Sequence, residues 1–207
     1  MKKAMISALL LLLFVSPAAS QSVWGPIATR VLKSIMPIEG PQGSCTGFMI
    51  NTEKHYVLTA GHCDQSGPGV TILADKTPAT LIYKDTKTDL LVFEAKQVDR
   101  PALKLAANSP KVGDAAASYG YGYGLRSPMF RVTHIAAIAA KIPEVAPATG
   151  PFIMTDTDFI PGQSGGPVVD INGDVVMIVQ MSAQGFGLGI GAEEIRDRVG
   201  KYFEVTK

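Results

Sequence analysis

The chain has 207 residues, of which 46% are hydrophobic and 18% are charged, so its composition is that of one or two globular domains and not of a disordered or fibrous protein. Its 19 basic and 18 acidic residues nearly balance, which gives no electrostatic basis for a nucleic-acid partner. The two cysteines are too few for a disulfide-framework miniprotein or for a four-cysteine zinc site.

The first twenty residues have the three parts of a secretory signal peptide. Lys2 and Lys3 form a basic start, residues 8–15 are apolar, and small residues lead up to Ser20, after which we expect cleavage. The apolar run is too short to span a bilayer as a helix, and no later segment is longer. We therefore expect 1–20 to be removed and 21–207 to be exported, periplasmic or secreted, with no membrane span in the mature chain.

The rest of the chain is predicted to be mostly short strands. Apolar stretches of four to nine residues alternate with Gly, Pro, Asn and Asp clusters, which is typical of an all-β barrel or sandwich. The predicted strands are 44–50, 56–59, 70–73, 80–83, 90–94, 115–119, 130–138, 152–155, 167–170, 175–181 and 187–190. Asn172-Gly173-Asp174 predicts a tight hairpin turn.

Only the end of the chain has helical periodicity. Ile195, Val199 and the pair Tyr202–Phe203 recur at the spacing of one apolar helix face, so we expect an amphipathic α-helix at about 193–204.

Three motifs carry residues suited to acyl transfer. Ser164 lies between small residues in Pro161-Gly-Gln-Ser-Gly-Gly-Pro167, where a tight turn can expose its hydroxyl. A free serine is a weak nucleophile and needs a general base, for which His62 in Thr59-Ala-Gly-His-Cys63 is the candidate. Asp89, in Asp89-Leu-Leu-Val92, supplies an acid at the start of another predicted strand.

With these flanking residues and in the order His, Asp, Ser, the sequence resembles the serine endopeptidases of the chymotrypsin/trypsin superfamily in their compact bacterial form. The resemblance extends from about residue 44 to the terminal helix. It implies an all-β fold of two packed six-stranded antiparallel barrels, at about 36–100 and about 112–192, followed by the C-terminal α-helix. The active site is then expected in the cleft between the barrels.

The same resemblance implies the roles of the site residues. Ser164 would attack the scissile carbonyl, His62 would accept and return its proton, and Asp89 would orient His62. The N–H groups of Gly162 and Ser164 would form the oxyanion hole, and a Cβ at 162 would crowd it.

The family pattern also implies that Cys45 and Cys63 form a disulfide, since export permits oxidation. We expect no metal and no cofactor. The expected partners are protein or peptide substrates, and the expected state is a monomer.

The departures from the digestive enzymes are informative. Gln163 replaces the Asp that captures a freed N-terminus in those enzymes, so activation by that ion pair is not expected. Gln163 resembles the pattern of Glu-specific endopeptidases and HtrA-like proteases, and the short spacings between the three site residues resemble HtrA-like protease cores. Since the sequence continues for only a few residues after its predicted terminal helix, we expect no PDZ domain. The alternative functions are a catalytically inactive binding module on the same fold and an esterase using the same three residues.

Primary specificity is predicted from the residue six positions before the nucleophile. In the family this position forms the base of the pocket for the residue before the cut, and Asp158 there would favour Lys or Arg. The predicted pocket walls are Gln180, Met181, Ser182 and Gly189. Three alternatives remain open: Asp158 faces water, Asp156 takes its role, or Phe159 closes the pocket so that it selects small or apolar residues.

Overall fold

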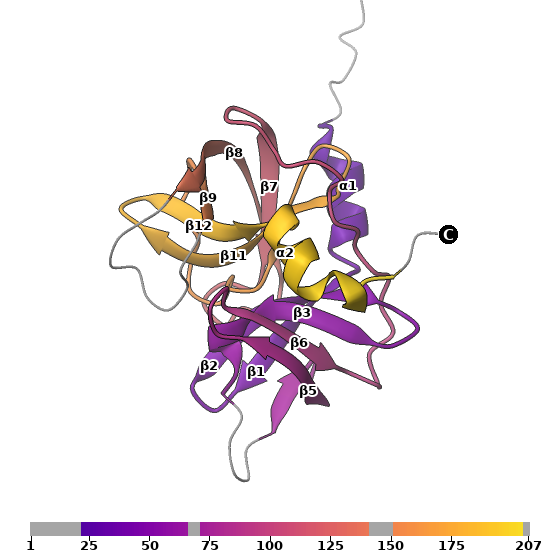
Figure 1. Ribbon diagram of the computed structural model, residues 1–207. Coiled ribbons are helices and arrows are strands. Elements are labelled where there is room, and N and C mark those ends of the chain that lie inside the picture. The colour runs from indigo at the N-terminus through magenta and orange to yellow at the C-terminus, as the bar shows by residue number, and fades with distance from the viewer. Residues whose placement is uncertain (1–21, 66–70, 141–150, 205–207) are drawn as a thin grey trace, which may run out of the picture.

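The computed structural model describes residues 22–65, 71–140 and 151–204, and its strands close into two six-stranded antiparallel barrels (Figure 1). The all-β, two-barrel fold with a C-terminal helix predicted from the sequence is confirmed. The proposed signal peptide at 1–20 and the start of the strand expected at 70–73 lie outside the described residues.

The first barrel is drawn in purple and magenta in Figure 1. Its strands are β1 (Ile35–Gly40), β2 (Gly43–Asn51), β3 (Tyr56–Ala60), β4 (Ile72–Ala74), β5 (Thr77–Asp85) and β6 (Leu90–Glu94), hydrogen-bonded in the order β1-β2-β3-β6-β5-β4. The barrel closes where β1 pairs with β4, with Ile38 opposite Ala74. The sequence did not predict β1, because Pro37 interrupts it. The proline is tolerated because its position needs no ladder donor, while its carbonyl accepts a bond from Asp75 N (3.0 Å).

The second barrel is drawn from rose through orange to yellow in Figure 1. Its strands are β7 (Ala115–Gly120), β8 (Met129–Ala140), β9 (Phe152–Thr155), β10 (Pro167–Val169), β11 (Val175–Ala183) and β12 (Phe186–Gly191), in the order β10-β11-β12-β9-β8-β7. The predicted hairpin turn joins β10 to β11, and Gly173 there has φ +78°, a conformation that glycine adopts without steric cost.

Two short helices complete the fold. The predicted terminal helix forms as α2 (Ala192–Val199), followed by a 3₁₀ turn at Gly200–Tyr202. The sequence did not predict α1 (Trp24–Val31), because Gly25 and Pro26 in its first turn are residues that disfavour a helix. Proline is compatible with the first turn of a helix because the first N–H groups have no intrahelical partner.

A shared apolar core holds the two barrels together. The buried cluster contains Trp24 and Ile27 from α1, Phe48 from the first barrel, Tyr119 from the second barrel and Ile195 from α2. Residues brought together from both barrels and both helices therefore fix how the barrels face each other, and the site described below lies along this junction.

Candidate active site

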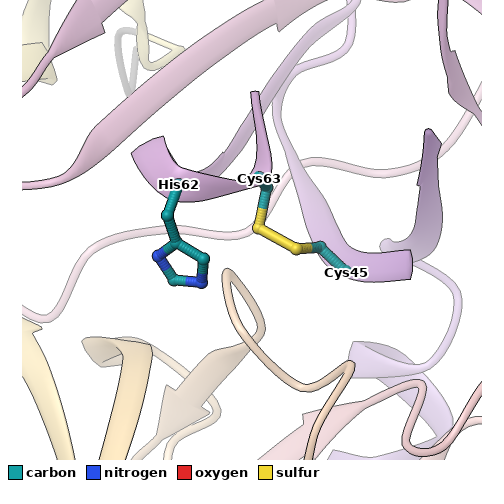
Figure 2. Close-up of side chains that lie close together, drawn as sticks. All are labelled: Cys45, His62 and Cys63. Carbon is teal, nitrogen blue, oxygen red and sulfur yellow. A yellow bond between two sulfur atoms is a disulfide. The ribbon is translucent and has the colours of Figure 1, made fainter. Parts of the chain in front are cut away.

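His62 lies in a single 3₁₀ turn, Gly61–Cys63, that directly follows β3 of the first barrel. A disulfide from Cys63 to Cys45 on β2 ties this turn to the barrel wall, as Figure 2 shows beside the His62 ring. The imidazole is about one-third exposed, so one edge of the ring is available to a substrate.

Asp89 holds His62 through both oxygens of its carboxylate. Its Oδ1 accepts the His62 backbone N–H at 2.6 Å, and its Oδ2 lies 2.6 Å from His62 Nδ1. The Asp89 side chain is only 4% exposed, so its carboxylate is shielded from water. With the Nδ1 proton directed at the carboxylate, the lone pair of neutral His62 is on Nε2, which is the nitrogen that a general base uses.

The backbone of Asp89 also connects the two barrels. Its carbonyl accepts hydrogen bonds from Gly61 N (2.7 Å) and from Gln180 Nε2 of β11 (2.8 Å). Asp89 has φ +54°, in the left-handed region where Asp is one of the residues least disfavoured. The sequence indicated the carboxylate, whereas the bond from Gln180 depends on tertiary placement that the sequence does not encode locally.

Ser164 comes from the second barrel, in the loop between β9 and β10. Its carbonyl accepts the backbone N–H of Thr46 on β2 at 2.8 Å, which places the nucleophile loop against the first barrel. Its hydroxyl donates to the carbonyl oxygen of Gln180 at 3.3 Å, which is long for an O–H···O hydrogen bond. The three predicted site residues thus converge on the junction between the barrels.

Gly162 has the backbone conformation that its predicted role requires. Its φ is +97°, and an added Cβ would lie 2.3 Å from the carbonyl oxygen of Tyr121, so no other residue fits without displacement. Within the described part of the chain, the amide N–H groups of Gly162 and Ser164 donate no hydrogen bond to another residue. Both donors are therefore available to an oxyanion.

The side chains of Cys45, His62 and Cys63 come within 4.8 Å of one another at their potential ligand atoms (Figure 2). Metal binding by cysteine requires thiolate sulfur, and both sulfurs here are consumed in the disulfide. This cluster therefore has the wrong chemistry for a metal centre.

Asp158 lies at the surface and is already paired. Its carboxylate is 2.9 Å from Arg131 Nη1, which also donates to the Asp158 carbonyl at 2.8 Å, and both side chains are about half exposed. Its negative charge is therefore compensated within the chain. The sequence did not predict Arg131 as its partner.

Asp156, the competing candidate for the pocket, is occupied elsewhere. It accepts hydrogen bonds from Thr133 Oγ1 (2.7 Å) and from the backbone N–H of His134 (2.8 Å), and its other oxygen lies 2.9 Å from His134 Nδ1. Partial burial alone raises the pKa of Asp156, but these bonds outweigh it and lower the pKa below its usual range.

Phe159 is buried, and its ring reaches β12 at Gly187. A Cβ added at Gly187 would lie 2.5 Å from Phe159 Cε2, so the Phe159 ring occupies the space that a side chain at position 187 would need. The Ser182 hydroxyl accepts the Phe159 N–H (2.6 Å) and donates to the Phe159 carbonyl (2.8 Å), which fixes this segment on β11.

Gly189, one of the predicted pocket-wall residues, lies on β12. A Cβ added there would lie 2.1 Å from the carbonyl oxygen of Ile178 on the neighbouring strand. Gly189 therefore permits close backbone packing between β11 and β12, and it is Gly187 that faces Phe159. Of the other predicted wall residues, Gln180 is buried and bonds to Asp89, whereas Met181 is half-buried.

Comparison with known proteins identifies the family. Residues 45–178, most of both barrels, match the family model described as a trypsin-like peptidase domain. The chain belongs to this family. The matched trypsin-like domain contains all three residues His62, Asp89 and Ser164.

Named relatives of this trypsin-like domain are bacterial proteases. The chain is 35% identical over 152 residues to a probable periplasmic serine endoprotease, DegP-like, from Chlamydia pneumoniae, covering 70% of this chain and 30% of the relative. It is 28% identical over 188 residues to the serine protease Rv3671c of Mycobacterium tuberculosis, covering 80% of this chain and 45% of the relative. The chain thus spans less than half the length of these relatives.

A solved structure of the Rv3671c protease, in an inactive form, superposes with a TM-score of 0.72 at 26% identity, covering 86% of this chain and 93% of that chain. Over residues 22–65, 71–140 and 151–204, no helix is both long and apolar enough to cross a bilayer.

Proposed function

We propose that this chain is an exported serine endopeptidase that hydrolyses peptide bonds through Ser164, His62 and Asp89. The observation that supports this most strongly is the two-point hold of Asp89 on His62, at 2.6 Å to both the backbone N–H and Nδ1, opposite the loop that carries Ser164. A mere binding module has no need for a buried carboxylate that sets the tautomer of an exposed histidine.

The proposed reaction has two steps, acylation of Ser164 and hydrolysis of the acyl-enzyme, and acylation comes first. Ser164 Oγ bonds to the scissile carbonyl carbon while its proton passes to His62 Nε2. The negative charge on the carbonyl oxygen is stabilised by the N–H groups of Gly162 and Ser164. The C–N bond then breaks, and His62 donates its proton to the departing amine.

The second step is hydrolysis of the acyl-enzyme by water. His62 takes a proton from a water molecule, whose oxygen attacks the acyl ester on Ser164, and the ester C–O bond breaks with return of the proton to Ser164 Oγ. The peptide acid leaves and the enzyme is restored. Asp89 stabilises the imidazolium in each step without itself becoming protonated.

For the residue before the cut, we propose a preference for small or apolar side chains over Lys or Arg. Two observations support this alternative. Phe159 fills the space beside Gly187, and the charge of Asp158 is compensated by Arg131, so a cationic side chain would have to displace an existing partner.

We further propose that residues 1–20 direct export, in line with the periplasmic location of the DegP-like endoprotease of Chlamydia pneumoniae given in its name. Protein or peptide substrates follow from the proposed activity. The monomeric state stays a prediction.

The proposed activity is tested by incubating the purified chain with an unfolded protein substrate. Wild type is expected to cleave it, and Ser164→Ala to lose about 10⁴-fold or more in kcat while keeping its circular dichroism spectrum and its melting temperature. Activity of Ser164→Ala within tenfold of wild type would show that another residue is the nucleophile. A wild type that binds the substrate without cleaving it would support the alternative of an inactive binding module.

A further inference from the structure

Thr46 lies on β2 of the first barrel and takes part in four hydrogen bonds, two of which reach the nucleophile loop of the second barrel. Its N–H donates to the Ser164 carbonyl (2.8 Å), and its hydroxyl donates to the Gly162 carbonyl (2.8 Å). The same hydroxyl oxygen accepts the N–H of Tyr121 (2.8 Å), and the Thr46 carbonyl accepts the hydroxyl of Thr59 (2.7 Å). Every polar atom of this fully buried residue is therefore used.

These bonds bracket one of the two oxyanion donors. The Gly162 carbonyl belongs to the peptide before Gln163, and the Ser164 carbonyl belongs to the peptide after Ser164. Between these two lies the peptide whose N–H is that of Ser164. Fixing the peptide groups on both sides restricts rotation of the one between them.

Gly162 is a flexible point in this loop, because glycine has low barriers to alternative backbone conformations and here has φ +97°. The peptide that carries its N–H is held by the bond from Tyr123 N to the Pro161 carbonyl (2.8 Å), and the peptide that follows is held by Thr46. Around Gly162, the Thr46 hydroxyl is the side-chain donor that holds the carbonyl in place.

We propose that Thr46 is a positioning residue that holds the oxyanion hole of the second barrel in its catalytic geometry from the first barrel. This inference rests on the proposed peptidase function. A hydroxyl is needed because one group must donate to the Gly162 carbonyl and accept from the Tyr121 N–H at the same time. Valine has the same shape as threonine but can do neither. Both partners would then be left unpaired in a buried place.

The test compares Thr46→Val, Thr46→Ala and Thr46→Ser by steady-state cleavage of one peptide. For Val and Ala we expect kcat to fall by roughly 10- to 100-fold, less than the 100- to 1,000-fold typical of losing an oxyanion donor outright, with KM changed less than threefold. Thr46→Ser keeps the hydroxyl and is expected to remain within fivefold of wild type.

A second readout separates positioning from general stability. A peptide boronate, which forms a tetrahedral adduct with the nucleophile, should lose affinity in Thr46→Val by about the same factor as kcat/KM, whereas a product peptide should bind as it does to wild type. Thr133→Val is the matched control, because it also removes a buried threonine hydroxyl bond (2.7 Å, to Asp156) in the second barrel and should leave kcat unchanged.

The results distinguish this inference from the proposed function. If wild type neither cleaves peptide nor binds boronate, the proposed function fails. If wild type is active but Thr46→Ala, which introduces no bulk, keeps full kcat, the positioning role is overturned. Equal losses in Thr133→Val, or failure of Thr46→Ser to restore activity, overturn it as well.

Discussion

The charge on Asp158 has a different consequence once its neighbour Arg131 is taken into account. As a lone carboxylate six positions before Ser164 it predicts a pocket for Lys or Arg, but Arg131 lies 2.9 Å from it and supplies the counter-charge. Exposed ion pairs contribute little to stability, so this one matters chiefly because it removes a free negative charge from the region. In the proposed specificity, Phe159 is then the side chain that limits the size of the bound residue.

This reading predicts the order in which peptides are cleaved. In matched peptides with Val, Ala, Leu, Arg or Glu before the scissile bond, Val and Ala should have kcat/KM at least tenfold above Arg, because the Phe159 ring restricts the space beside Gly187 and the charge of Asp158 is already compensated by Arg131. Asp158→Asn should keep the same order. An Arg preference in wild type that disappears in Asp158→Asn would restore Asp158 to the pocket.

At the scale of elements, α1 is integral to the folded domain. Trp24 is 8% exposed and stacks near Phe130 of β8 with ring centroids 6.3 Å apart, and Ile27 and Val31 are buried on the same helix face. A segment that buries three large side chains in the shared core differs from a loosely attached leader. We therefore expect α1 to stay docked in the active protein.

Trp24 is the single tryptophan of the sequence, so its fluorescence reports on α1 directly. Emission should move to the red in the same urea transition that abolishes the far-ultraviolet circular dichroism, because α1 shares the core of the barrels. Trp24→Ala should lower the free energy of unfolding by about 3–5 kcal/mol. The control Val23→Ala, at a side chain 56% exposed, should change it by less than about 0.5 kcal/mol. A red shift well before the loss of circular dichroism would show that α1 detaches independently.

The sequence predicts the elements and motifs that depend on local pattern, and misses those that depend on distant partners. The apolar pattern of the sequence predicts the strand at 152–155, and the flanking residues single out His62, Asp89 and Ser164. The structure places all of them on strands or turns of the expected barrels. Thr46 shows the limit, since a threonine after a cysteine in a strand has no local sign that its hydroxyl will meet Gly162, 116 residues away.

The whole molecule is tied together across its junction by the C-terminal segment. Tyr202, after α2, packs edge-on against Tyr56 of β3 with centroids 5.7 Å apart, and Arg198 of α2 lies 3.7 Å from Asp85 at the end of β5. Asp85 opens the turn that leads to Asp89, and it accepts the N–H of Lys87 (2.8 Å). The helix that follows the second barrel thus supports the loop of the first barrel that carries Asp89, the proposed partner of His62.

Asp85 makes stability dependent on pH in a defined direction. Burial alone raises the pKa of Asp85, but hydrogen bonds from Lys87 and Thr88 and the charge of Arg198 outweigh it and lower the pKa below the ordinary value of 3.8. A carboxyl with a lowered folded pKa stabilises the fold above the unfolded value, and this contribution is lost as the pH falls through the folded value.

Asp85→Asn should therefore lower the free energy of unfolding by about 1 kcal/mol at pH 7, and the difference from wild type should shrink progressively as the pH falls below 3.8 and through the lowered folded pKa. Urea unfolding at several pH values measures it. A difference that stays constant from pH 7 to pH 3 would mean that the charge of Asp85 contributes nothing.

Covalent labelling tests most directly whether Ser164 is a nucleophile activated by His62. A fluorophosphonate is incubated with wild type and with His62→Ala, and the adduct is located by peptide mass spectrometry. We predict one adduct per chain, on Ser164, in wild type, and a labelling rate at least 100-fold slower in His62→Ala, because the hydroxyl then lacks its base. No adduct on wild type, an adduct on another serine, or equal labelling of both proteins would contradict the account.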